Sequence, residues 1–181
     1  MKKIIVLALV FCMLLCTACS VNKNAEDVSG TDTTDIGEVV EEVTPKEDVE
    51  VNLYYSDNQG TGLHKEARTL SYDDAHNPEA VLKELFKGTQ NTSFTNVIPD
   101  TVTINSCTLE DGICTVDLSV DFIEIQGTAA QEMAMYSIVN TLCEMEEVDK
   151  VQYLIDGEKV ELFGYFDLAS PFEADMTFVA D

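Results

Sequence analysis

The chain has 181 residues, and its 34 Asp and Glu residues against ten Lys and Arg residues give a formal net charge of −24 at pH 7. This length leaves room for one domain and additional segments. Such a negative charge repels phosphate backbones, so the composition argues against nucleic acid as a partner. The absence of Trp weighs, more weakly, against a surface on which carbohydrate rings stack.

The N-terminus has the pattern of a bacterial lipoprotein signal peptide. Lys2 and Lys3 precede an apolar run over residues 4–15, which is too short for a comfortable transmembrane helix but suits a signal-peptide core. The run leads into Cys16-Thr17-Ala18-Cys19, which resembles a lipobox. We therefore predict a signal peptide over residues 1–19 with Cys19 as the lipidated residue. An ordinary signal peptide or an uncleaved anchor is the alternative.

The next segment, residues 20–50, is strongly acidic. It carries ten acidic side chains against Lys23 and Lys46, and it has no aromatic residue. Such a segment buries too little apolar surface to offset the entropy lost on ordering, and its like charges extend it. We predict a disordered acidic linker here, a folded domain over residues 51–173 and a C-terminal tail over residues 174–181.

The domain is predicted to begin with two extended segments and a short helix. Val51, Leu53 and Tyr55 alternate along a first strand, and residues 63–71 form the second segment. Asn77-Pro78-Glu79 then combines a capping Asn, a Pro in the first turn and a carboxylate near the positive helix end. The helix has an apolar face and a terminating glycine, made of Val81, Leu82, Leu85, Phe86 and Gly88.

A β-hairpin is predicted around Glu110-Asp111-Gly112, with a bulge near Asn105-Ser106. Residues on the return strand alternate between two faces. The inward face is expected to hold Cys114, Val116, Leu118 and Val120, and the outward face Thr115, Asp117, Ser119 and Asp121.

A long helix leading directly into a buried strand is predicted to organise the core. Thr128 is its expected N-cap, and Gln131 completes a capping box. One apolar stripe follows at helical spacing, made of Met135, Ile138, Val139, Leu142 and Met145. The strand contains Val151, Tyr153 and Ile155 and ends in an Asp156-Gly157 turn. The predicted class is α+β, with two helices packed on one face of a mixed or antiparallel sheet.

The three cysteines of the predicted domain are expected to act as small buried hydrophobic residues. Cys107, Cys114 and Cys143 contain no C-x-x-C pair, which argues against a zinc site or a thioredoxin-like motif. A two-residue turn would make Cys107 and Cys114 diagonal neighbours, too far apart for an easy disulfide. A four-residue loop would place them opposite each other, so the sequence leaves a disulfide open.

No catalytic residue, cofactor or metal ligand is predicted. His64 and His76 have no Cys or His companion at ligand spacing, and no nucleophile motif accompanies them. Asp117 and Asp121 offer oxygen ligands of the kind that calcium prefers. They are spread along a strand rather than gathered in a loop, so a solvated face is the expected role.

Several blocks of the sequence together resemble the GerMN domain, a family of sporulation and germination domains. The blocks are Asn77-Pro78-Glu79-Ala80-Val81-Leu82 with Leu85 and Gly88, Val97-Ile98-Pro99, Asp111-Gly112, Val116-Asp117-Leu118-Ser119 with Phe122, Asn140-Thr141-Leu142, residues 148–157, and Gly164 with Asp167-Leu168-Ala169-Ser170-Pro171. The resemblance covers residues 51–172. The protein for which the family is named carries two such domains in tandem, whereas this chain has one.

The resemblance implies a ring-building-motif-like α+β module in an extracytoplasmic lipoprotein of a Gram-positive bacterium. It implies no catalytic residues, so the leading hypothesis is a non-enzymatic protein-interaction module held on the cell membrane through Cys19. Its expected partners are envelope proteins, in a homo- or hetero-oligomer, with a role in envelope, sporulation or germination assembly. The alternative is a lipoprotein that binds a solute or glycan on the outward sheet face or beside the long helix.

Overall fold

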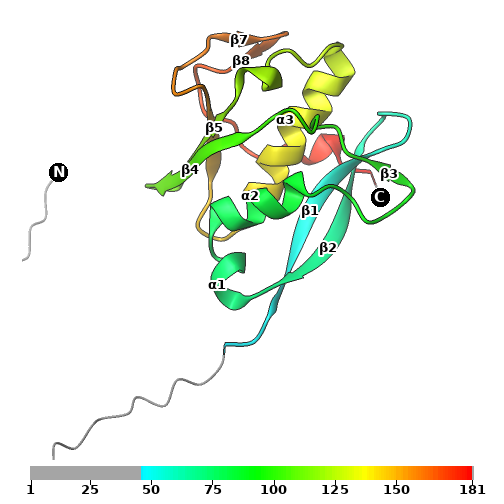
Figure 1. Cartoon of the computed structure of the whole chain (residues 1–181), viewed down its shortest axis with the longest axis vertical. Helices are drawn as coiled ribbons and strands as arrows, with labels where there is room; N and C mark the ends of the chain where they lie inside the picture. The colour runs from blue at the N-terminus through cyan, green and yellow to red at the C-terminus, as the bar shows by residue number, and fades with distance from the viewer. Residues whose placement is uncertain (1–45, 181) are drawn as a thin grey trace, which may run out of the picture. The chain divides into compact units, whose positions relative to one another are not determined.

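The computed structural model describes residues 46–180 (Figure 1). The predicted signal peptide, Cys19 and the linker up to residue 45 lie outside the described residues. The elements, in chain order, are β1 (Val49–Asp57), β2 (Leu63–Leu70), α1 (Tyr72–Ala75), α2 (Pro78–Phe86), β3 (Phe94–Thr95), β4 (Ile104–Glu110), β5 (Ile113–Leu118), η1 (Val120–Phe122), α3 (Thr128–Leu142), β6 (Lys150–Ile155), β7 (Leu162–Phe163), β8 (Phe166–Asp167) and η2 (Met176–Phe178).

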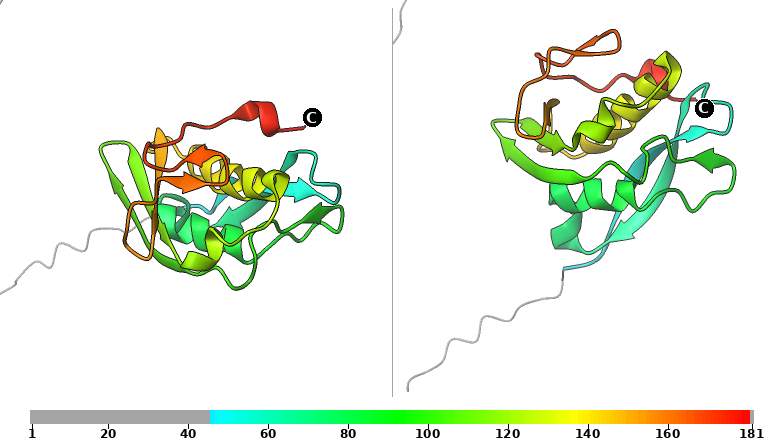
Figure 2. Two further views of the ribbon diagram at one scale, coloured as in Figure 1. Left: turned by 90° about the horizontal axis from the view of Figure 1, so that it is seen from above. Right: turned by 45° about the horizontal axis from the view of Figure 1, so that its top comes forward.

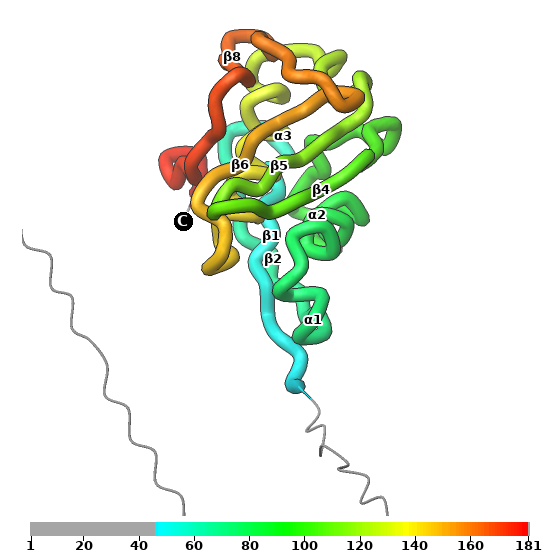
Figure 3. The backbone as a smooth tube through the Cα atoms, turned by 90° about the vertical axis from the view of Figure 1, so that its left-hand side faces the viewer, coloured from blue at the N-terminus to red at the C-terminus, as the bar shows by residue number. Residues whose placement is uncertain are grey.

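The strands form two three-stranded sheets and a small hairpin, which confirms the α+β class. The first sheet has the order β2-β1-β3 and is antiparallel; the second has the order β4-β5-β6 and is mixed, because β5 and β6 run parallel. Figure 3 follows β4, β5 and β6 side by side. Helices α2 and α3 pack against each other, α3 also contacts β1 and β6, and α2 contacts β4. The helical pair therefore joins the two sheets (Figure 2).

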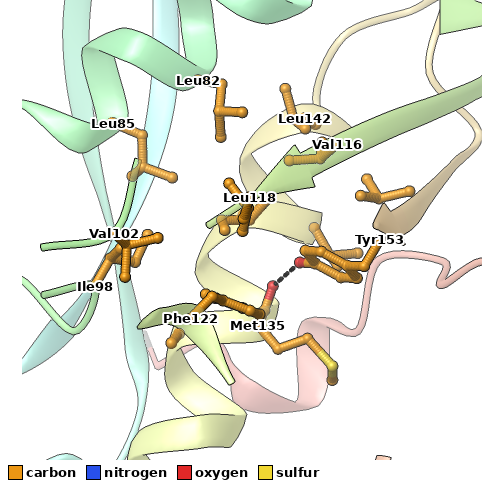
Figure 4. Packing of buried hydrophobic residues seen from close by; sticks show 14 of the residues in the cluster. Leu82, Leu85, Ile98, Val102, Val116, Leu118, Phe122, Met135, Leu142 and Tyr153 are labelled. Carbon is orange, nitrogen blue, oxygen red and sulfur yellow. Dashed lines mark hydrogen bonds between the residues drawn. The ribbon is translucent and has the colours of Figure 1, made fainter. Parts of the chain in front are cut away.

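The main core lies where β5, α2 and α3 meet (Figure 4). Tyr153 of β6 is fully buried, stacks on Phe122 and donates its hydroxyl proton to the Met135 carbonyl at 2.8 Å. Cys114, Val116 and Leu118 point inward as predicted. The prediction for Val120 is wrong: β5 ends at Leu118, the chain turns into η1, and Val120 is 44% exposed.

The short helix and the β4–β5 hairpin confirm their sequence signals. The Asn77 side chain accepts hydrogen bonds from the Glu79 and Ala80 amides, and Gly88 follows the helix at a φ of +85°. Glu110 pairs with Ile113 across a two-residue turn, and the register shifts at the predicted bulge, between Ile104 and Ser106. Local backbone chemistry therefore determines both features.

The start of α3 differs from the prediction. Gly127, at a φ of +94°, occupies the N-cap position without a side-chain bond, and Thr128 is already the first helical residue. The Gln131 side chain does not complete a capping box; it donates to the Ile125 carbonyl at 2.8 Å. The positive φ of Gly127 sets the direction in which the chain enters the helix. The Gln131 side chain then binds the segment before α3 rather than the helix N-terminus.

Helix α3 is buried on more than the single predicted stripe, because two of its hydroxyl groups bind the backbone of β1. The Tyr54 amide donates to Thr141 Oγ1 at 3.0 Å, and Ser137 Oγ donates to the Tyr54 carbonyl at 2.6 Å. Tyr54 alternates with the inward Leu53 and Tyr55, yet its side chain is also fully buried, in a second cluster with Leu63 and Met133. Strand β1 is thus covered on both faces.

A buried arginine fastens α2 to the first sheet. Arg68 of β2 binds the Glu66 carboxylate, donates to Glu84 of α2 at 3.0 Å and donates to the Gly88 carbonyl at 2.9 Å. Two carboxylates and a carbonyl thus accept four hydrogen bonds from the guanidinium, which supplies the pairing that a buried cation requires. Removing Arg68 would leave Glu66 and Glu84 without the cation that they share.

The segment predicted as a C-terminal tail contacts the domain as far as residue 180. Asn140 of α3 donates to the Asp175 carbonyl at 3.1 Å, and its own side-chain oxygen accepts from the Asp175 amide at 2.9 Å. Phe178 stacks on Tyr136 with ring centroids 4.5 Å apart. The Ala180 amide donates to the Leu63 carbonyl at 2.9 Å. This strap covers the second cluster.

Thr141→Val tests the bond between α3 and β1. The substitution keeps the side-chain shape but removes the acceptor of the buried Tyr54 amide, so we expect the free energy of unfolding in urea to fall by about 1–3 kcal/mol. Thr108→Val, at an exposed position of β4, is the matched control and should change it by less than about 0.5 kcal/mol. Equal effects of the two variants would contradict the assignment.

Candidate interaction surfaces

An acidic pocket lies beside the C-terminal end of α3. It has a volume of about 240 Å³, and β1, α2 and the segments after α1 and α3 line it. Its charged and polar lining includes Glu50, His76, Thr141, Glu144, Glu146 and Glu147. Carboxylates at the negative end of a helix raise the local negative potential, so this pocket favours a positively charged group.

Glu144 is the hub of the polar contacts in this pocket. Its carboxylate accepts hydrogen bonds from Tyr54 Oη at 2.5 Å, Lys65 Nζ at 2.6 Å and Asn52 Nδ2 at 3.2 Å. Burial opposes its ionisation, but the bonds from Lys65 and Tyr54 outweigh burial and hold its pKa below the ordinary value. Burial, followed by the bond to Glu144, raises the pKa of Tyr54 to about 12. Glu144 is therefore an anion that ties α3 to β1 and β2.

Neither of the two histidines is paired with a nucleophilic side chain in the part of the chain that the structure describes. His64 stacks on Phe94 with ring centroids 5.1 Å apart, and its Nε2 lies 3.9 Å from an Asp57 oxygen. Asp57 is already engaged in closing its turn through bonds from Thr61. His76 stacks on Tyr72, and its Nδ1 lies 2.7 Å from the Tyr72 carbonyl. Among residues 46–180, no Ser, Thr or Cys side chain is hydrogen-bonded to either imidazole.

Asp117 does not lie on a solvated face, which corrects the prediction. It is buried, and its Oδ1 accepts the Gly157 amide at 2.9 Å. The carboxylate therefore stabilises the turn after β6, while Asp121 accepts a hydrogen bond from Ser119. Within the described part of the chain, no three His, Cys, Asp or Glu side chains gather in a way that could hold a metal ion.

The outward face of the second sheet forms an open groove of about 450 Å³. Its lining combines apolar and polar side chains: Ile113, Leu154, Ala169 and Pro171 with Glu110, Asp111, Thr115, Gln152 and Lys159. Gln152 alternates with the inward Val151 and Tyr153, but the segment after β8 covers it, and its amide donates to the Leu168 carbonyl at 2.8 Å. The groove therefore has polar side chains on its lining, but it lies open to solvent and would enclose a solute less than a typical small-molecule site does.

The β7–β8 hairpin presents two large apolar side chains to solvent. Leu162 is 64% exposed and Tyr165 is 84% exposed. Their neighbours anchor the hairpin, because Phe163 is buried against Phe122 and Phe166 lies edge-on to Tyr136. Figure 1 places this hairpin at the end of the domain that includes the start of α3. The sequence signal for this hairpin is a glycine with two bulky apolar residues on each side, between Glu161 and Asp167.

Gly164 makes the hairpin possible for two reasons. It has a φ of +61° in the two-residue turn between Phe163 and Phe166. A Cβ atom at this position would also collide with the Gln131 side chain at the start of α3. The turn therefore holds Leu162 and Tyr165, hereafter the hairpin tip, in a fixed position.

Glu144→Gln tests the role of the acidic hub. A pKa below the ordinary value of 4.5 means that Glu144 stabilises the fold above that pH and loses this contribution as the pH falls through the folded-state pKa. We expect the variant to be less stable than wild type by about 0.5–1 kcal/mol at pH 7, because solvent screens a partly exposed pair. The difference should shrink below pH 4.5. Glu146→Gln, in the same pocket, is the control and should show no such convergence.

Comparisons with known proteins identify the domain. The Germane family model, described as sporulation and spore germination, matches residues 52–161. The tandem GerMN domains of the sporulation protein GerM from Bacillus subtilis align with a TM-score of 0.52 and 20% identity, over 71% of this chain and 46% of that chain. At this identity the likeness establishes the fold alone. No curated protein matches the chain.

Two further solved structures are similar at lower scores. The first GerMN domain of the same protein gives a TM-score of 0.48 and 21% identity, over 70% of this chain and 96% of that chain. A Clostridium perfringens protein provisionally described as a lipoprotein gives 0.49 and 21%, over 70% and 87%. Among residues 46–180, no helix has the length and apolar character needed to cross a bilayer. Because the family model spans more than half of the chain, the chain belongs to the Germane family of sporulation and spore germination domains.

Proposed function

We propose that this chain is a lipid-anchored extracytoplasmic protein whose domain binds an envelope protein and catalyses no reaction. The observation that carries the proposal is the hairpin tip: two large apolar side chains exposed to solvent on a turn that the buried Phe163 attaches to the core. Exposed aromatic and aliphatic residues on a preorganised turn are the kind of anchor that dominates protein–protein binding energy. Their partner is expected to offer an apolar pocket.

The charge of the domain narrows the choice of partner. Residues 46–181 contain 27 acidic and seven basic residues. Glu161 and Asp167 flank the hairpin tip directly. An apolar anchor surrounded by carboxylates is complementary to an apolar pocket with a basic rim, and such a rim would also accelerate association.

The family and the N-terminal pattern support the location and the setting. The matching family model is described as sporulation and spore germination, and a similar structure belongs to a sporulation protein. The lipobox-like Cys16-Thr17-Ala18-Cys19 precedes the acidic segment. Together these support an anchor on Cys19 and a role in envelope assembly during sporulation or germination.

Solute binding is the second candidate, and the acidic pocket is the feature that supports it. Its volume of about 240 Å³ lies below the roughly 300–1,000 Å³ of typical small-molecule sites. Its carboxylates restrict a ligand to a small cation, and Glu144 already has an intramolecular cation, Lys65, as its partner. The pocket therefore supports solute binding less strongly than the hairpin tip supports a protein contact.

Cys19→Ala tests the anchor. The substitution removes the thiol to which lipid would attach, so we expect the protein to move from the membrane fraction to the soluble or secreted fraction. Metabolic labelling with a clickable fatty acid should mark wild type and leave the variant unlabelled. Cys143→Ala is the control and should retain both label and membrane association. A labelled Cys19→Ala variant would contradict the assignment.

Tyr165→Ser combined with Leu162→Ser tests the contact surface. A photocrosslinking amino acid placed at residue 165 in living cells should capture a defined envelope protein, and the double substitution should weaken binding to that purified protein by about tenfold or more. Met176→Ser, at another exposed apolar position, is the matched control for binding and for folding. Undiminished binding by the double variant would overturn the assigned surface. Hydrolytic activity of the purified protein would overturn the non-enzymatic role.

A further inference from the structure

Two cysteine sulfurs meet in the second sheet. Cys107 Sγ of β4 lies 3.3 Å from Cys114 Sγ of β5, and both thiols are free. Cys107 is half-buried and Cys114 is fully buried. Both belong to the sheet face that packs on the core, beside α2. This contact brings together two thiols, which can be oxidised to a disulfide.

The strand register explains why the thiols touch without being directly opposite. Cys107 pairs with Val116 and Leu109 pairs with Cys114, so the two cysteines are diagonal neighbours. The bulge next to Cys107 increases the local twist, which brings one diagonal closer than in a flat pair. A disulfide has an S–S bond of about 2.05 Å, so the sulfurs would need to approach by about 1.2 Å. Strand β4 is at the edge of its sheet, where such a shift disturbs the pairing with one strand only.

We infer that Cys107 and Cys114 form a reversible disulfide, a redox site in the edge strand of the domain. Two thiols of the protein are oxidised, and an external disulfide, from a small molecule or a thiol oxidoreductase, is reduced to two thiols. The pair itself does not depend on the proposed partner. Its oxidation in cells does rest on the proposed extracytoplasmic location, where disulfides persist.

The geometry assigns different steps to the two sulfurs. The half-buried Cys107 is accessible to an oxidant, and the hydrogen bond from Cys114 lowers its pKa, which favours the thiolate. Its thiolate attacks one sulfur of the external disulfide and expels the other as a thiolate. The buried Cys114, whose pKa is raised by its bond to Cys107 and by burial, then loses its proton and attacks the Cys107 sulfur. The second external thiol leaves in that step.

Cys143 does not compete for this chemistry. Its Sγ contacts the Asp149 carbonyl at 3.7 Å, and burial raises its pKa to about 11. Because the thiolate is the reactive form, Cys143 is slow to attack an oxidant. It therefore serves as the internal control.

Oxidation of the two thiols would change the stability of the edge strand β4. It would fix β4 to β5 beside the bulge and restrict the opening of an edge that has no second strand neighbour. Amide hydrogen exchange in β4 is expected to slow on oxidation. The diagonal register also predicts a strained bond that a dithiol reduces without denaturant.

Peptide mapping of the oxidised full chain tests the inference. The folded protein is treated with glutathione disulfide, remaining thiols are alkylated, and a glutamyl endopeptidase is applied. Cleavage after Glu110 separates Cys107 from Cys114, and cleavage after Glu132 and Glu144 isolates Cys143. We expect the two peptides to remain covalently joined in wild type and Cys143→Ser, and to separate after dithiothreitol. They should never be joined in Cys107→Ser or Cys114→Ser.

The outcomes separate this inference from the proposed function. Wild-type protein that stays folded by circular dichroism yet yields no joined peptides overturns the redox site, whatever its location in the cell. A link from Cys107 to Cys143 overturns it as well. If acid-quenched cells contain membrane-bound protein in which Cys107 and Cys114 are only reduced, the inferred oxidation in cells is wrong. That result would not affect the proposed anchor or the proposed partner. Loss of membrane association alone would contradict the anchor and not the thiol pair.

Discussion

Two hydroxyl groups on α3 take the place of a missing strand, and the arrangement of the domain depends on them. Strand β1 pairs with β2 over most of its length, but with β3 only at Ser56 and Asp57. The amide and carbonyl of Tyr54 therefore need other partners, and Thr141 and Ser137 supply them from one helical turn. Leaving both groups unpaired would cost about 1–3 kcal/mol each. With α3 fixed on β1, its C-terminal end forms the acidic pocket and its first turn supports the β7–β8 hairpin.

Charge determines what this scaffold can bind. Six of the seven basic residues in the described part of the chain form ion pairs, and Lys159 is the exception within that part. Their charge is thus neutralised locally, while most carboxylates face solvent with no cation nearby. Two copies of such a surface repel each other at the ionic strength of cells, except where apolar contacts dominate. The electrostatics therefore favour a basic hetero-partner over a homo-oligomer.

Most local chemistry could be predicted from the sequence, with the capping of α3 as an exception, and long-range contacts could not. Asn77 and the Asp111-Gly112 turn carry their structural signals within a few residues, so their elements were predicted correctly. Asp117 and Gln152 alternate correctly for an outward face, yet a turn and a C-terminal segment cover them. Strand alternation reports which face a residue is on and says nothing about what later packs there. Tyr54 shows the same limit, because it alternates with the inward Leu53 and Tyr55 and is nevertheless buried.

In the β7–β8 hairpin, the residues that folding requires differ from those that the proposed binding requires. Folding requires Gly164 for the turn, and Phe163 and Phe166 for attachment to the core. Leu162 and Tyr165 make no such contribution, because most of each side chain is in water. A single exposed apolar residue needs no explanation, but two on one rigid turn of a strongly acidic domain do. The hairpin begins immediately after the 52–161 segment that the family model matches. The matched segment forms most of the scaffold, so the specificity of the proposed protein contact is best sought in the residues that follow it.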